Sequence, residues 1–414
     1  MKQIIRIATA GSVDDGKSTL IGRLLFETKS LKKDQLEHIE EKSRIENKGY
    51  VDFSLATDGL LTERRQGITI DVSHIYLQTS TRRYIIADSP GHVEYTRNMV
   101  TGASTAHAAI ILLDAQKGVS EQTIRHFRIT SLLGISQLIF AINKMDLIGF
   151  SELKFKEIQK DILNLNQSSN RLHQKLFFIP ISALHGDNIV SKSVHIPWYQ
   201  GNILLDLIER LNVVEPSSKD SVLNVQYVLR PKDQTGSVPR GYAGKVACGK
   251  FMNHSSVVVF PGSNVSNITK IEHHGKETHE AKESENITLY LKDDIDISRG
   301  SVIVSDPHTL QKTNRFKATV CWMESDALEH GNKYWMQHGV NRILCKVVSV
   351  EGKMNLITGG IENINYLQIN DLGKVQFQLG QELLIKPFAE NKPLGSFILI
   401  NYLTNNTAGV GFIN

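Results

Sequence analysis

An eight-residue glycine loop near the start of the chain constrains the fold more than any other feature of the sequence. Gly11 to Ser18 reads GSVDDGKS, which matches the pattern GxxxxGK[ST], and it lies between an expected strand over 4–10 and an expected helix. In that setting backbone N–H groups and the helix N-terminus bind phosphate, so we expect a nucleotide site rather than a glycine turn without a ligand. The residues expected to contact the nucleotide here are Gly11, Ser12, Val13, Asp14, Asp15, Gly16, Lys17, Ser18 and Thr19.

A second motif, NKMD at 143–146, follows an expected strand and predicts which base is bound. Guanine presents two adjacent donors, N1–H and the N2 amine, and the two acceptor oxygens of Asp146 pair with both. Adenine lacks this donor pair, and sites built on such pairs discriminate strongly. Alone, the motif fits a polar turn equally well, but its place after a glycine loop favours guanine. The residues expected around the base are Asn143, Lys144, Met145 and Asp146, followed by Ser182, Ala183, whose amide is expected at guanine O6, and Leu184.

Two further stretches are expected at the γ-phosphate. RQGITID at 65–71 offers Thr69, whose hydroxyl is expected at a magnesium ion, and DSPGH at 88–92 follows a strand. Loops that bind only the triphosphate form act as switches that are released on hydrolysis. A single histidine after a turn is usually a surface residue, but next to Gly91 we expect His92 to orient the attacking water. The nucleotide contacts expected in the second stretch are Asp88, Ser89, Pro90, Gly91 and His92.

These motifs assign a chemical role to a smaller group of residues. Lys17 is expected to reach the β- and γ-phosphates, and the Ser18 hydroxyl is expected to ligate magnesium. The expected magnesium ligands are Ser18, Thr69 and Asp88, the last through a water molecule, and the expected catalytic residues are His92, Lys17 and Thr69.

The pattern of apolar segments predicts an α/β domain followed by all-β structure. A chain of 414 residues is too long for one ordinary core. Short apolar strands alternate with helical patterns up to a linker at 213–221, beyond which strands dominate, with a break at 305–315. We therefore predict an α/β P-loop GTPase domain over 1–216, with a mostly parallel sheet and helices on both faces, and two antiparallel β-barrel domains over 222–308 and 314–414. Strands are expected over 4–10, 84–87, 108–113, 138–142 and 177–180, and helices after the glycine loop, near Glu121, over 152–164 and near Asn202.

Composition excludes several classes of protein. The longest apolar run, at 109–115, is far shorter than the roughly 18 residues that a membrane span needs. Arg6 interrupts the first apolar stretch, so no cleaved signal is expected and we expect a cytoplasmic protein. The three cysteines are widely spaced and fit reduced thiols. A formal charge of +4 is too small to imply nucleic-acid binding.

The motifs GSVDDGKST, RQGITID, DSPGH, NKMD and SAL, followed by PWYQGN and two expected barrels, resemble the translation elongation factor group of GTPases. Within that group, GSVDDGKSTLIGRLL, TDGLLTERRQGITIDV, IIADSPGHVEYTRNMVTGAS, INKMDL and DDIDISRG are most similar to the GTPase subunits of the heterodimeric bacterial sulfate adenylyltransferases. The resemblance extends over essentially the whole chain.

This resemblance implies a reaction and a partner. ATP and sulfate give adenosine 5′-phosphosulfate and pyrophosphate, with GTP hydrolysed alongside, and the implied cofactors are GTP and Mg²⁺. Because the phosphate–sulfate anhydride is a high-energy bond, its formation is uphill and a second hydrolysis drives it. We find one nucleotide loop and no pyrophosphate loop of the SGGxDS kind. Adenylyl transfer is therefore expected elsewhere, and the resemblance implies that it lies on the partner, subunit 2, an ATP pyrophosphatase-type catalytic subunit that brings ATP and sulfate. Neither nucleic acid nor a membrane is expected as a partner.

Two other functions remain open at this stage. The chain is also compatible with a factor that delivers aminoacyl-tRNA, which a basic tRNA-binding face would favour and which Asp15 and DDIDISRG disfavour. Alternatively, the barrels are interaction modules for an unknown protein.

Two local segments have their own alternatives. The stretch 272–280, EHHGKETHE, is either a metal site or, as we expect, a solvated hairpin tip, and the charged run 29–44 is either a nucleic-acid patch or, as we expect, a helix.

Overall fold

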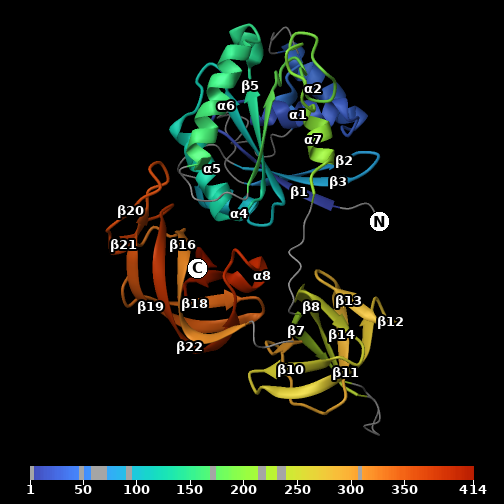
Figure 1. The fold of residues 1–414 in the computed structure, drawn as a ribbon, viewed down its shortest axis with the longest axis vertical. Helices are drawn as coiled ribbons and strands as arrows, with labels where there is room; N and C mark the ends of the chain where they lie inside the picture. Colours follow the sequence, from blue (N-terminus) through green and yellow to red (C-terminus); the bar gives the residue numbers. More distant parts are fainter. Residues whose placement is uncertain are drawn as a thin grey trace. The chain divides into compact units, whose positions relative to one another are not determined.

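The computed structural model describes residues 4–45, 51–56, 72–89, 96–167, 174–212, 221–230, 239–305 and 310–414. The chain falls into two compact units (Figure 1). The first comprises Met1–Val213 with Asn355–Gly360, and the second comprises Val214–Met354 with Ile361–Asn414. Each unit has a hydrophobic core of its own.

The first unit is built on a six-stranded sheet in the order β2-β3-β1-β4-β5-β6. All neighbouring pairs are parallel except β2 and β3, which are antiparallel. Every residue of β4 and β5 is buried, as expected for parallel strands covered on both faces. The strands are β1 (Ile4–Ala10), β2 (Ser73–Gln78), β3 (Arg83–Asp88), β4 (Ala108–Asp114), β5 (Gln137–Asn143) and β6 (Lys175–Pro180).

Helices cover both faces of this sheet (Figure 1). On one face, α1 and α7 pack in a core with alternate residues of β5 such as Ile139. On the other face, Phe127 of α5 packs against Phe140 of β5, with ring centroids 6.0 Å apart. The helices are α1 (Lys17–Glu27), α2 (Lys33–Ile45), α4 (Thr96–Ala103), α5 (Glu121–Leu132), α6 (Glu152–Gln167) and α7 (Leu204–Glu209), with 3-10 turns η1 (Phe53–Ala56) and η3 (Met145–Ile148).

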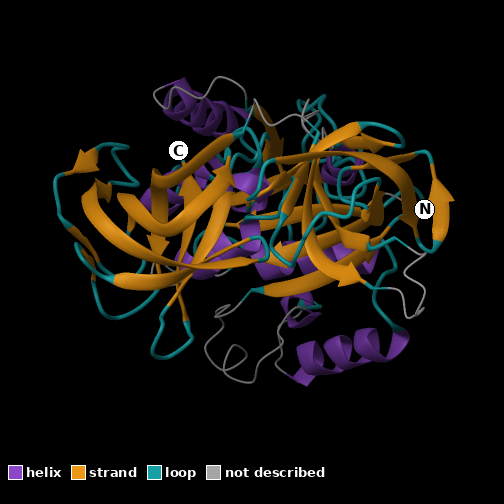
Figure 2. Cartoon of the chain, turned by 90° about the horizontal axis from the view of Figure 1, so that it is seen from below, coloured by secondary structure: helices purple, strands orange, loops and turns teal. Residues whose placement is uncertain are grey.

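The second unit contains two closed antiparallel barrels, as the sequence predicts (Figures 1 and 2). The first closes in the order β10-β15-β7-β8-β14-β11, through pairing of β10 with β11, and the second in the order β18-β23-β24-β16-β22-β19, through pairing of β18 with β19. The strands of the first barrel and its edges are β7 (Val222–Leu229), β8 (Gly241–Cys248), β9 (Lys250–Met252), β10 (Ser256–Phe260), β11 (Asn264–His273), β12 (Lys276–Thr278), β13 (Glu280–Lys282), β14 (Asn286–Leu291) and β15 (Val302–Val304).

The second barrel is longer in its strands and carries one short helix. Apolar side chains of both barrels, among them Val222, Cys248 and Leu394, form one buried cluster, which explains why the barrels are a single compact unit. The elements are β16 (Gln311–Trp322), β17 (Leu328–Glu329), β18 (Lys333–His338), β19 (Asn341–Met354), β20 (Ile361–Glu362), β21 (Tyr366–Leu367), β22 (Leu372–Ile385), α8 (Lys392–Gly395), β23 (Ser396–Ile400) and β24 (Thr407–Ile413).

The structure confirms the secondary structure expected for the two charged segments. The run 29–44 contains the helix α2. The stretch 272–280 contains the turn between β11 and β12, where His274 and Gly275 both have positive φ and are exposed. No group of His, Cys, Asp or Glu side chains suited to a metal ion occurs among the described residues. All three cysteines are buried, and none of them forms a disulfide bond.

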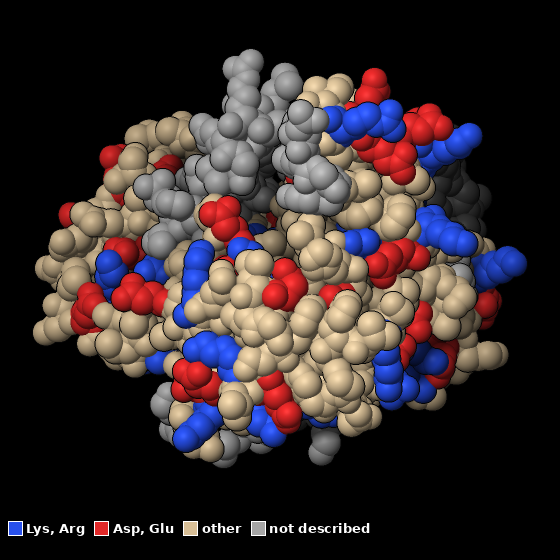
Figure 3. Space-filling view, turned by 90° about the horizontal axis from the view of Figure 1, so that it is seen from above, with Lys and Arg blue, Asp and Glu red and all other residues tan. Residues whose placement is uncertain are grey.

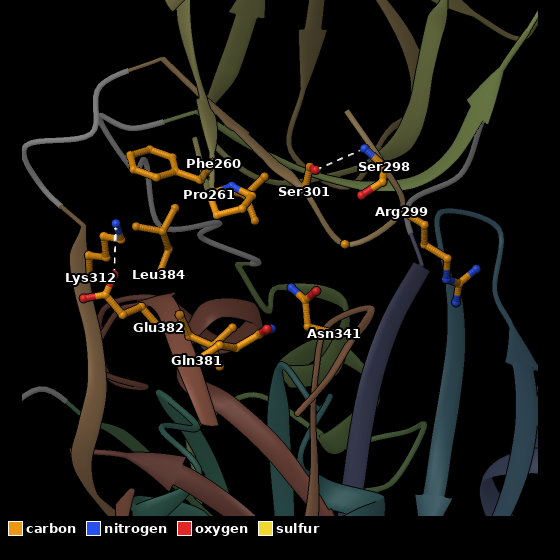
Figure 4. A pocket seen from close by; sticks show the side chains of 13 residues that line it. Phe260, Pro261, Ser298, Arg299, Ser301, Lys312, Asn341, Gln381, Glu382 and Leu384 are labelled. Carbon is orange, nitrogen blue, oxygen red and sulfur yellow. Dashed lines mark hydrogen bonds and ion pairs between the residues drawn. The ribbon is translucent and has the colours of Figure 1, made fainter. Parts of the chain in front are cut away.

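A cavity of about 330 Å³ lies within the second unit, between residues of the two barrels. Figure 4 shows Lys312 paired with Glu382, at 3.0 Å, on one side of the cavity and Ser298 bonded to Ser301 on the other. Lys312 and Glu382 therefore neutralise each other, while Arg299, which also lines the cavity, donates to the Gln226 carbonyl oxygen at 3.4 Å. Within the described part of the chain, no helix is long and apolar enough to span a membrane.

Candidate nucleotide-binding site

The glycine loop connects β1 to α1, and its backbone suits a phosphate ligand. Gly16 at the N-cap of α1 has a φ of 91°, a left-handed conformation that favours glycine. A Cβ at this position would collide with the side-chain amide nitrogen of Asn143. No side chain caps the helix, so its first N–H groups are available to an anion.

Lys17 lies along the loop with its ammonium group held by backbone carbonyls. Its Nζ donates to the carbonyl oxygens of Gly11, at 2.8 Å, and Ser12, at 2.9 Å, and the residue is only 7% exposed. Burial lowers the pKa of Lys17, and the nearby carboxylates of Asp88 and Asp15 oppose that shift. The loop thus already contains a desolvated, positioned cation of the kind that pairs with phosphate oxygens.

Asp15 closes the loop on itself. Its Oδ2 accepts a hydrogen bond from the Ser12 amide at 2.6 Å, and the residue is 2% exposed. Burial raises the pKa of Asp15, while the Ser12 amide and the ammonium of Lys17 lower it. The side chain therefore braces the loop, and its backbone remains the part expected to contact a nucleotide.

Asn143 joins the glycine loop to the loop after β6. Its Nδ2 donates to the carbonyl oxygen of Asp15 at 2.7 Å, and its Oδ1 accepts from the Ala183 amide at 2.9 Å. The sequence directs the Ala183 amide to guanine O6, whereas the structure directs that amide to Asn143, and the Leu184 amide is the next donor along the loop.

Lys144 is held by an acid that the sequence analysis did not single out. Its Nζ lies 2.8 Å from Oδ2 of Asp114, the last residue of β4, which is 2% exposed. The other oxygen of Asp114 accepts from the Gln116 amide at 2.8 Å. Asp114 pairs in register with Asn143 on β5, so the signal was present as a charge that ends a wholly apolar strand.

Asp146, the expected reader of guanine, follows in η3. Its side chain is 17% exposed, and its Oδ2 lies 3.9 Å from Nε2 of His185 in the loop after β6. The carboxylate is therefore accessible, and it faces the same loop that Asn143 contacts. Within the NKMD motif, Asn143 thus joins the glycine loop to the loop after β6, Asp146 faces the latter loop, and Lys144 is held by β4.

Asp88, the expected magnesium residue, lies at the end of β3. It is 2% exposed, and its Oδ1 accepts from the hydroxyl of Thr9, its register partner on β1, at 2.9 Å. The next residue, Ser89, is fully buried and its hydroxyl has no hydrogen-bond partner among the described residues. Ser18 follows Lys17 in the first turn of α1, and the Asp88 carboxylate raises the pKa of Lys17 against the effect of burial. This oxygen-rich surrounding fits a Mg²⁺ ion that also takes phosphate oxygens and water.

Four of the expected site residues are not among the described ones. Thr69, Pro90, Gly91 and His92 fall outside the part of the chain that the structure describes. Their contacts with the γ-phosphate, the metal and the attacking water therefore stay predictions.

Surface charge bears on the choice between partners. On the face drawn in Figure 3, lysine and arginine side chains are interspersed with aspartate and glutamate across the described residues. A basic face that would favour tRNA is not seen among these residues in this view.

Comparison with known proteins finds similarity over the full length of this chain. Residues 2–217 match the family described as Elongation factor Tu GTP binding domain, and residues 315–414 match GTP-eEF1A C-terminal domain-like. Sulfate adenylyltransferase subunit 1 of Bacteroides fragilis is 42% identical, over all of this chain and 86% of that protein. The protein of the same name from Colwellia psychrerythraea is 41% identical, over all of this chain and 88% of that protein. The bifunctional enzyme CysN/CysC of Mycobacterium tuberculosis is 42% identical, over all of this chain and 67% of that protein.

Proposed function

Because this chain belongs to the sulfate adenylyltransferase subunit 1 family and contains its GTP-binding domain, we propose that it is the GTPase subunit of a sulfate adenylyltransferase. Hydrolysis of GTP on this chain drives the synthesis of adenosine 5′-phosphosulfate from ATP and sulfate on a partner subunit. The observation that carries the proposal is similarity above 40% identity along the whole chain, barrels included. That similarity favours this function over delivery of aminoacyl-tRNA.

The partner carries the adenylyl-transfer chemistry in this proposal. Forming a phosphate–sulfate anhydride from ATP and sulfate is uphill, so a second exergonic hydrolysis is needed for a good yield. The sequence contains one glycine loop of the GxxxxGK[ST] kind. We assign that loop to GTP, and we assign ATP and sulfate to subunit 2, which lies with this chain in a cytoplasmic heterodimer.

Guanine recognition rests on a framework of contacts that join distant parts of the chain. Asn143 holds the glycine loop to the loop after β6, and Asp114 holds Lys144, so the base site is formed around Asp146. We propose that Asp146 pairs with N1–H and the N2 amine, and that backbone amides of 182–184 approach O6. Preorganised polar groups of this kind lower the cost of ordering the site on binding.

At the phosphates, Lys17 and the N-terminus of α1 bind the β- and γ-phosphates. Magnesium is held by Ser18 and, through water, by Asp88, with Thr69 in the triphosphate state, and it supplies charge neutralisation at the β- and γ-phosphate oxygens. His92 orients the attacking water. The other nucleotide contacts in this proposal are those predicted from the sequence motifs. The proposal also divides the chain into domains over 1–216, 222–308 and 314–414.

Co-expression with the partner tests the function. The chain is purified alone and with subunit 2, and sulfate-dependent pyrophosphate release is measured with and without GTP. We expect release only from the complex and a higher yield with GTP. Full-rate phosphosulfate synthesis by the isolated chain, or capture of aminoacyl-tRNA in place of subunit 2, contradicts the proposal.

A further inference from the structure

Helix α1 clamps the loop that follows β6. The guanidinium of Arg23 donates from Nε to the carbonyl oxygen of Ala183 at 3.3 Å and from Nη2 to that of Leu184. One turn later, the carboxylate of Glu27 accepts a hydrogen bond from the Val190 amide and lies 3.7 Å from Arg23 Nη1. A donor and an acceptor on one helix face therefore fix two points of the loop that also contacts Asn143.

Arg23 has a second neighbour on its other side. Its guanidinium carbon lies 4.8 Å from the ring centroid of Phe53, in η1, and the ring of Phe26 lies 4.6 Å from that of Phe53. A Cβ at Gly22 would collide with the Phe53 carbonyl, so the backbone of η1 rests directly on α1. Phe53 is 5% exposed, and it anchors the segment 52–56 on the helix.

The segment 52–56 is tied to α2 and precedes the stretch expected at the γ-phosphate. The Asp52 amide donates to the Ser43 hydroxyl of α2 at 2.8 Å. Along the chain, the next residues predicted to contact the nucleotide are those of RQGITID, which contains Thr69. Arg23 thus contacts both the loop 182–184, which is expected at the base, and Phe53, which holds the segment 52–56 on α1. That segment precedes the predicted switch in the sequence.

The planar guanidinium is suited to this double role. Its fork donates to two successive carbonyls while its face lies on an aromatic ring, and burial lowers its pKa, opposed by Glu27. A lysine at this position keeps the charge, but its ammonium lacks both the fork and the flat face.

We propose that Arg23 is a positioning residue that couples the docking of the segment 52–56 to the loop 182–184, which reads guanine O6. The proposal rests on the proposed guanine site and adds a regulatory link to it. Because coupling between two sites is reciprocal, a change that lifts Phe53 from Arg23 weakens base recognition, and a bound guanine strengthens the docking of Phe53. A protein that contacts α2 therefore has a route to nucleotide release.

The test compares three nucleotides on the full chain by competition against a fluorescent guanine nucleotide. GTP and ITP both carry O6 and the N1–H donor, whereas the triphosphate of 2-aminopurine riboside lacks both and so lacks the contact with the loop 182–184. Arg23→Lys is expected to weaken GTP and ITP about 5-fold or more, and to the same extent, while the 2-aminopurine nucleotide changes less than about 2-fold. Equal losses for all three nucleotides, or no loss for GTP, overturn the positioning role.

Phe53→Leu tests the coupling without touching the loop at the base. We expect the same ordering of nucleotides with a smaller loss for GTP, and unchanged GTP affinity in this variant overturns the coupling. Lys156→Gln removes an exposed partner of Glu152 on α6 and is the matched control, expected to leave all three affinities unchanged. If the wild-type chain fails to prefer GTP to the 2-aminopurine nucleotide, the guanine site itself is wrong, and this outcome is distinct from a failure of Arg23.

Discussion

The nucleotide site of the first unit and the cavity of the second unit are both polar, but their polar groups are held in different ways. In the first unit the groups are buried: Asn143, which joins Asp15 to Ala183, and Asp114, which pairs with Lys144, are each 2% exposed. In the cavity, Lys312 and Glu382 pair with each other while about half exposed. Buried polar and charged groups are costly to maintain, and such groups cluster at functional sites, so the difference in burial favours the first unit as the ligand site.

The largest effect that this contrast predicts is at Lys17. Lys17→Ala deletes a buried cation that faces the expected phosphates, and we expect GTP and GDP affinity to fall about 100-fold or more. Equilibrium binding of a fluorescent nucleotide measures this loss, with Lys156→Ala as the exposed control. A variant that retains near wild-type affinity contradicts the claim that the buried charges of the first unit mark the nucleotide site.

Asp146→Asn is expected to change the base that is preferred. The two acceptors of the carboxylate become one acceptor and one donor, which complements xanthine rather than guanine. We expect the ratio of GTP to XTP affinity to fall by about 100-fold or more, measured by competition between the two nucleotides. An unchanged preference for guanosine nucleotides removes the base-reading role.

Asp114→Asn sharpens the contrast, because Asp114 has no expected contact with the nucleotide. It removes the carboxylate that fixes Lys144, and Lys144 also has a φ of 62°, which is uncommon for a residue other than glycine. We expect GTP and GDP to bind about 10-fold more weakly and to the same extent, since the base site is common to both. Glu152→Gln, which removes one side of an exposed ion pair, is the control. An effect on GTP alone places the role of Asp114 at the γ-phosphate instead.

The smallest effect is expected in the cavity of the second unit. Lys312→Gln breaks an ion pair whose members are 43% and 53% exposed, so we expect a loss of at most about 1 kcal/mol in the free energy of unfolding. Nucleotide affinity is expected to stay within about 2-fold of the wild type. Thermal unfolding and nucleotide binding measure these two quantities. A larger change in either one shows that the cavity has a role in function and contradicts the difference between the two regions.

The sequence predicts the elements of the first unit better than their contacts. The five expected strands are found within one or two residues of their expected bounds, because each is an apolar run and four of them end at a motif. The edge strand β2 and the short helix α4 were not expected, since β2 is largely exposed and α4 has only eight residues. The two barrels follow from β-rich composition, but their sheets pair strands such as β18 and β23 that are far apart along the chain.

In the candidate site, too, the sequence predicts some residues and misses others that depend on tertiary contacts. Motif residues such as Lys17, Asn143 and Asp146 are recognisable because their spacing has a chemical meaning. Asp114 and Arg23 carry no such spacing, and each acquires its contacts only when the sheet brings β4 beside β5 or α1 beside the loop after β6. The sequence also directs the Ala183 amide to the ligand, whereas packing directs it to Asn143.

The most direct test of the account is the coupling of GTP hydrolysis to phosphosulfate synthesis in the complex of this chain with subunit 2. Progress curves of phosphosulfate are recorded for the wild type and for His92→Ala, with GTP and with a non-hydrolysable analogue. We expect His92→Ala to lower GTP turnover about 100-fold at nearly unchanged GTP affinity, and its synthesis to stop at the low yield reached without GTP. A His92→Ala complex that reaches the wild-type yield while its GTP turnover is lost contradicts the claim that hydrolysis on this chain drives the reaction.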